Sequence, residues 1–168
     1  MRTLLAIALP IAAVALAACG PSRVHPAGSA MVNAAGVSFP IRTMGVHFGG
    51  PLGRGDNSEV TLVAADAGDA CVNSSVEGSA THEVRVRVFG PPPGRYPVTS
   101  ALQALGLATQ HVATAEVEIL GGDDLLATGA SGTVTLGEMT SAGLAASVHV
   151  ALDDGSNLDL EFVAALCP

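Results

Sequence analysis

The sequence contains no tryptophan and no lysine, and only one tyrosine and four phenylalanines occur among its 168 residues. We attribute the lack of lysine to the codon bias of a GC-rich genome rather than to a site. With so few rings, a folded core has to be built from valine, leucine and alanine. Because alanine-rich strands bury little area each, a covalent crosslink would matter more for stability than in a protein with a larger core.

The second half of the chain has no positively charged side chain apart from histidine. Residues 96–168 contain nine acidic residues and no arginine or lysine, whereas six arginines and six acids balance in residues 19–95. An acidic half of this kind repels nucleic acid and anionic lipid surfaces. The sequence therefore argues against a nucleic-acid partner. Solubility explains the charge more simply than an acidic recognition surface does.

Motifs that carry catalysis or bind cofactors are also absent. There is no G-x-S-x-G, H-E-x-x-H or C-x-x-C, and no glycine-rich phosphate loop between a strand and a helix. The adjacent acids Asp123 and Asp124 lack the D-x-D-x-D-G context of a calcium loop. We expect no cofactor, no metal and no catalytic site. A hydrolase would require four acids on solvated strand faces to converge in one cleft, namely Glu83, Glu116, Glu118 and Asp159.

The N-terminus begins with Met1-Arg2 and an apolar run that ends at Leu16-Ala17-Ala18-Cys19. This stretch resembles the lipobox of bacterial lipoproteins, and the resemblance covers residues 1–20. It implies a signal peptide over residues 1–18 and a lipid on Cys19 that attaches the mature chain to a membrane. An ordinary secretory signal and an uncleaved anchor helix are the alternatives. Gly20 stands where that family's inner-membrane retention signal is usually aspartate, which favours the outer membrane of a Gram-negative cell.

The resemblance also leads to a prediction for the other two cysteines. If Cys19 carries lipid, Cys71 and Cys167 remain as a pair in an oxidising compartment, and two thiols allow one connectivity. The resemblance therefore implies a Cys71–Cys167 disulfide that fastens the C-terminal end. The loop-entropy model gives such a long loop roughly 4–5 kcal/mol. A catalytic or metal-binding thiol is the alternative, although neither cysteine has a histidine or second cysteine at ligand spacing.

The region after Cys19 divides into a tether and one domain. Residues 20–36 are rich in glycine, alanine, proline and serine and have no apolar period, so we interpret 19–36 as a flexible tether. The remaining residues, 37–168, are expected to form a single domain. The strongest structural signal in it is a hairpin around Asp153-Asp154-Gly155, flanked by two long alternating strands. One short helix is expected over Ser100–Leu105, ended by Gly106.

Many short period-two segments and almost no helix predict an all-β fold. We expect an antiparallel β-sandwich of about eight strands, with a partly closed β-barrel as the alternative. Residues Ser131–Cys167 resemble the C-terminal part of small bacterial lipoproteins, a group that brings no activity to carry over. The sequence thus predicts a non-enzymatic envelope lipoprotein that contacts an envelope protein. The alternative is a β-domain that binds a small ligand or a metal at Gly121–Asp124 or at a barrel mouth.

Overall fold

The structure, a computed structural model, describes residues 30–49, 59–68, 70–71, 80–109 and 112–167. These residues form ten strands and one helix. In chain order they are β1 (Met31–Ala34), β2 (Val37–Pro40), β3 (Thr43–Phe48), β4 (Glu59–Ala65), β5 (His82–Phe89), β6 (Gly94–Pro97), α1 (Ala101–Thr109), β7 (Thr114–Gly121), β8 (Asp124–Thr140), β9 (Gly143–Leu152) and β10 (Asn157–Leu166).

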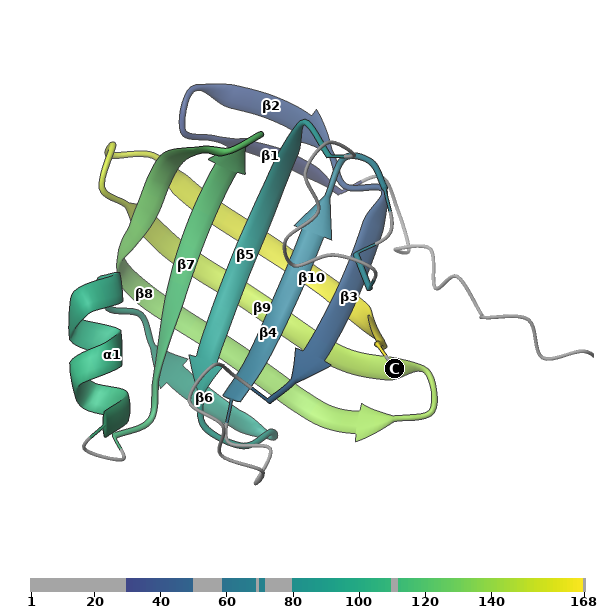
Figure 1. Ribbon diagram of the computed structural model, residues 1–168, viewed down its shortest axis with the longest axis vertical. Coiled ribbons are helices and arrows are strands. Elements are labelled where there is room, and N and C mark those ends of the chain that lie inside the picture. The colour runs from purple at the N-terminus through teal and green to yellow at the C-terminus, as the bar shows by residue number, and fades with distance from the viewer. Residues whose placement is uncertain (1–29, 50–58, 69, 72–79, 110–111, 168) are drawn as a thin grey trace, which may run out of the picture.

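Seven strands close into a barrel because β8 is long enough to pair with two neighbours. Its first part pairs with β7 and its later part with β9. Around the barrel the order is β8, β7, β5, β4, β3, β10, β9 and again β8, with β6 added beside β8. In Figure 1, β7, β5, β4 and β3 form the near wall, and β8, β9 and β10 cross behind them.

The all-β prediction is confirmed, and the structure has the barrel rather than the sandwich. A sandwich would consist of two separate packed sheets, whereas here one eight-stranded sheet continues through β8 and closes on itself. The predicted C-terminal hairpin is also confirmed: β9 and β10 pair in register from Asn157 opposite Ala151 to Ala164 opposite Leu144.

The barrel interior is filled with aliphatic side chains. Alternating residues of β4, β5 and β7 point inward in register, for example Leu62, Val86 and Val117, and all three are buried. Phe39, Tyr96 and Phe162 are the rings that join this core. The residue types expected from the composition therefore do form the core, and no charged side chain belongs to this interior cluster.

One barrel pairing is much shorter than the others. β3 and β10 are parallel and pair only through Gly45 with Ala165 and Val46 with Leu166, followed by a hydrogen bond from the Cys167 amide to the Val46 carbonyl, 3.0 Å. We call this pairing the β3–β10 seam. Because so few ladder bonds hold it, the seam depends on other contacts to stay closed.

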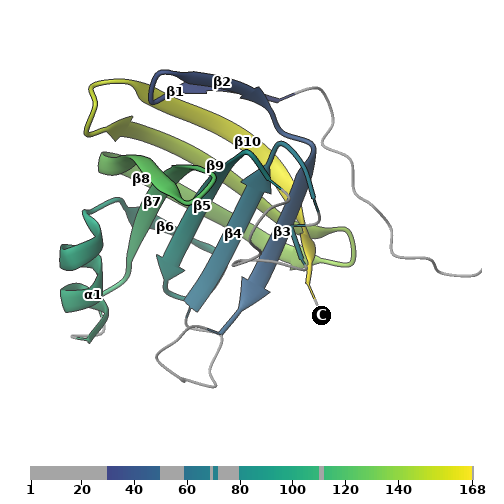
Figure 2. The same cartoon turned by 45° about the horizontal axis from the view of Figure 1, so that its top comes forward.

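The first described residues correct the predicted domain boundary. Residues 31–36, which we assigned to the tether, form β1 and the turn into β2, and Val32 and Ala34 are buried in the core. Ala35 and Gly36 take up the turn with positive φ values of 55° and 70°. Figure 2 shows this hairpin lying over one end of the barrel. It is part of the domain because its alternate side chains cover apolar residues that would otherwise meet water.

The single helix is longer than the sequence predicts. It begins at Ala101, after Ser100, and continues past Gly106 to Thr109. The helix lies outside the barrel next to β7 (Figure 1), where Ala104 and Ala108 pack on Phe89. Packing on this aromatic ring stabilises the second turn, which explains why the intrinsic cost of Gly106 does not end the helix.

Candidate functional site

The three cysteines lie in different situations. Cys19 is outside the described residues, so its predicted lipidation stays a prediction. Cys71 and Cys167 lie at disulfide distance, with a Cα–Cα separation of 5.0 Å across 96 residues of chain, as the cysteine count predicts. This pair lies at the β3–β10 seam: a Cβ added to Gly45 would come within 2.8 Å of the Cys167 sulfur.

Three of the acids named above meet on the outer face of β4, β5 and β7. Arg85 contacts Glu83 and Glu118, and Arg87 contacts Glu118 and Glu116 at 3.3 and 3.5 Å. Strand register causes this, because Arg87 lies opposite Glu116 and Arg85 opposite Glu118. We name the set the charge cluster: Glu59, Glu83, Arg85, Arg87, Glu116 and Glu118. Asp159, the fourth acid, lies on β10 and does not join it.

The charge cluster corrects the prediction that these acids lie on a solvated face. Glu116 is 2% exposed and Glu59 is 6% exposed, and each has a carboxylate oxygen that makes no hydrogen bond with the described part of the chain. Burial raises the pKa of Glu59, an effect that the charge of Arg87 opposes. Burial also raises the pKa of Glu116; Arg87 again opposes it, whereas Glu118 adds to it. Arg87 is the cation that makes the burial of these carboxylates tolerable.

The three described histidines, His47, His82 and His149, do not gather into a site. His47 on β3 forms a hydrogen bond with the carbonyl of Ala70, 3.0 Å, and His149 pairs with Asp159 across β9 and β10, 2.8 Å. His149 lies on the outer face of its strand, as expected, with 55% of its side chain exposed. Within the described residues, no three His, Cys, Asp or Glu side chains are arranged to hold a metal ion.

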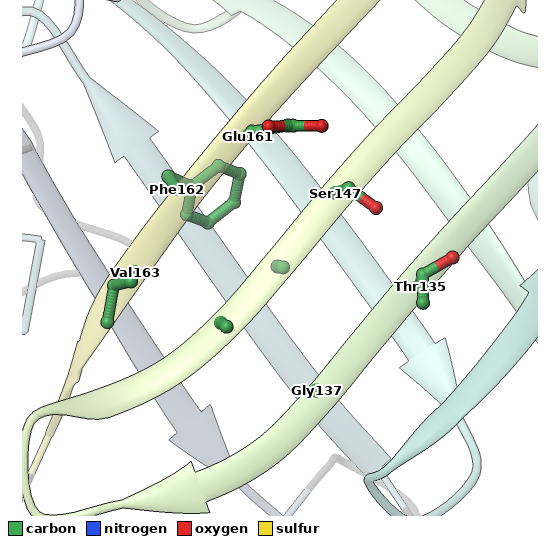
Figure 3. A pocket seen from close by; sticks show the side chains of 8 residues that line it. Thr135, Gly137, Ser147, Glu161, Phe162 and Val163 are labelled. Atoms are coloured by element: carbon green, nitrogen blue, oxygen red, sulfur yellow. The ribbon is translucent and has the colours of Figure 1, made fainter. Parts of the chain in front are cut away.

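A groove lies on the outer face of β8, β9 and β10, with a volume of about 460 Å³. Figure 3 shows Thr135, Ser147 and Glu161 in one row across these strands. Beside this row the groove is hollow because Gly137 and Ala145 carry little or no side chain, and Val163 forms its apolar wall. The register of β8 and β9 shifts between Leu136 and Met139, and this bulge bends β8 at the same place.

The groove lies on the acidic side of the molecule. Its row is extended by Arg95 of β6, which lies opposite Thr135. From β8 to the end of β10 the chain has no arginine or lysine. The acids of this side are Asp124, Glu138, Asp153, Asp154, Asp159 and Glu161. Asp153 and Asp154 are held within turns, where hydrogen bonds from Thr128 and Ser156 respectively lower their pKa values. Glu161 is exposed on the strand itself.

Sequence reasoning placed no site at this groove. The strand over Ser131–Leu136 and the hairpin strands were predicted, but Gly137 and Ala145 were not recognised as the small residues that make a hollow. A glycine directly after an alternating strand was the available signal, since glycine in a strand often marks a bulge.

Neither a family model, nor a curated protein, nor a solved structure matches this chain. The described residues form a closed seven-stranded barrel with an apolar interior and an outer groove that combines apolar and polar side chains. No helix of the described residues is long and apolar enough to cross a membrane.

Proposed function

We propose that this protein is a non-enzymatic lipoprotein of the cell envelope that acts by contact with another envelope protein. A lipid on Cys19 attaches it to the membrane, and residues 20–29 form the tether before β1. Gly20 favours the outer membrane of a Gram-negative bacterium. The observation that carries the proposal is the lipobox Leu16-Ala17-Ala18-Cys19, directly before a region without strand or helix signals.

The barrel interior supports contact rather than ligand storage as the activity. The inward-facing residues that the structure describes form an apolar cluster, which suits a packed core better than a site for a polar small molecule. The groove on β8, β9 and β10 is open to solvent and carries polar groups. A surface of this kind suits recognition of another molecule's side chain.

Cys19→Ser is expected to move the protein from the membrane fraction to the soluble envelope fraction, because several acyl chains at about 0.8 kcal/mol per buried CH₂ are lost. Fractionation and an intact mass of the mature chain measure this. Cys167→Ser also removes one thiol but should remain with the membrane. If Cys19→Ser fractionates like the wild type, or if the mature mass lacks acyl chains, the lipoprotein proposal is wrong.

A further inference from the structure

Three oxygen-bearing side chains of the groove have no partner among the residues that the structure describes. Among the described residues, the Glu161 carboxylate and the hydroxyl groups of Ser147 and Thr135 accept or donate no hydrogen bond and form no ion pair. Asp159, two residues before Glu161, is already paired with His149. The row in Figure 3 is therefore a set of acceptors available to another molecule.

The apolar part of the groove lies directly beside these acceptors. Ala145 of β9 lies opposite Val163 of β10. Gly137 of β8 leaves space next to Ala145, because a Cβ added at position 137 would lie 3.2 Å from the Ala145 Cβ. Val163 is 36% exposed. A ligand group that fits both parts needs an apolar stem and a cationic end with several donors.

We propose that the groove receives a lysine side chain of the partner protein. Its methylene stem lies over Gly137, Ala145 and Val163, and its ammonium group donates hydrogen bonds to Glu161 and Ser147, which lie opposite each other on β10 and β9. A lysine ammonium is a compact charge with several donors at the end of a flexible apolar stem, which suits neighbouring oxygens beside an apolar hollow.

Charge and composition together select this occupant. β8, β9 and β10 carry acids and no arginine or lysine, and Arg95 of β6 lies beside Thr135, at the end of the row away from Glu161. A cationic group is therefore attracted to the Glu161 end of the row. This chain contains no lysine, so a second copy of it cannot supply the side chain. The inference rests on the proposed function, because it assumes that the lysine belongs to an envelope protein that the anchored domain meets.

Carbodiimide crosslinking tests the inference, because it joins a carboxylate to an amine without a spacer and is most efficient where the two are already adjacent. Since the chain has no lysine, every isopeptide to a lysine is intermolecular. In intact cells that express the full protein, mass spectrometry is expected to find Glu161 joined to a lysine of one envelope protein. Ala145→Leu, which fills the hollow and leaves every charge in place, should lower the yield about fivefold, the ratio that corresponds to about 1 kcal/mol of lost apolar contact with the lysine stem.

Matched controls separate the groove from general attraction. Glu161→Gln removes the crosslinked carboxylate and should abolish this isopeptide. Asp124→Asn changes the same charge at an exposed position at the start of β8 and should leave the Glu161 yield unchanged. Purified protein with acetyl-Ala-Lys-Ala-amide should give the same Glu161 product, and Ala145→Leu should lower it too.

The outcomes distinguish this inference from the proposed function. A partner that is crosslinked only through other residues, together with no Glu161 product from the peptide, overturns the lysine groove but keeps the anchored-contact proposal. A Glu161 product from the peptide without any partner in cells keeps the groove and rejects the proposed function. The inference is also overturned if Ala145→Leu gives the same Glu161 yield as the wild type. It is overturned as well if Glu161 is joined only to amines that are not lysine side chains, such as free amines or amino sugars.

Discussion

Replacing Cys71 and Cys167 with serine is expected to lower the free energy of unfolding by about 3–5 kcal/mol. The disulfide spans 96 residues and thereby restricts the unfolded chain strongly. In the folded state it lies at the β3–β10 seam, where only two residue pairs and one further hydrogen bond join the strands. Both effects act in the same direction, so we expect this to be among the most destabilising changes in the molecule.

Urea denaturation of the double variant and of the wild type measures this difference, and wild type treated with a reductant should match the variant. Hydrogen exchange should show that amides of β3 and β10 lose more protection than those of β5 and β7, which pair over eight residues. A loss below about 1 kcal/mol, or protection lost evenly across the barrel, would contradict a role at the seam.

The strands were predictable because their side chains alternate between an apolar interior and a polar surface. Val84, Val86 and Val88 alternate with Glu83 and Arg85, and the structure buries the valines while the charged side chains point outward. The hairpin around Asp153 and Gly155 was predictable for the same reason, with turn residues added. A period-two pattern indicates which face of a strand is buried, and these strands follow it.

The closure of the barrel was not predictable from such patterns. It depends on Gly45 and Val46 meeting Ala165 and Leu166, which are far apart in the sequence. Local alternation carries no information on such a pairing, which is why we expected the sandwich first and the barrel only as the alternative. The strand at Met31–Ala34 was missed because it is only four residues long and its small and polar surroundings have the composition of a tether. Only two of its residues are buried, so its apolar alternation is too short to recognise in the sequence.

The charge cluster and the groove show a second limit. Glu116 and Glu118 share the alternating pattern of ordinary solvated residues, yet Glu116 is 2% exposed. Whether a strand's outer face meets water depends on what packs over it, and that information lies elsewhere in the chain. The groove likewise depends on Gly137 lying beside Ala145 of the next strand, a relation between neighbours in space and not in sequence.

Arg87→Leu is expected to lower the free energy of unfolding by about 3–5 kcal/mol at pH 7, because it leaves buried carboxylates without their cation. Glu116 loses its contact at 3.5 Å, Glu118 loses one at 3.3 Å, and Glu59 loses the charge that opposes its raised pKa. Arg95→Leu is the matched control. Arg95 is exposed and forms no ion pair with the described residues, so its loss should change stability by less than about 0.5 kcal/mol.

The pH dependence of the Arg87→Leu effect identifies its cause. A carboxyl whose pKa is raised in the folded state costs stability as pH rises from its ordinary value through the raised value, because the folded protein must then give up a proton that it prefers to keep. Without Arg87 the pKa values of Glu59 and Glu116 rise further, so the variant should approach the wild type as pH falls from 7 toward 5. Adding Glu116→Gln should restore at least about 1 kcal/mol at pH 7. Denaturation at both pH values measures these differences. A loss that is the same at pH 5 and pH 7, with no rescue by Glu116→Gln, would mean that Arg87 acts through packing of its stem and not through charge.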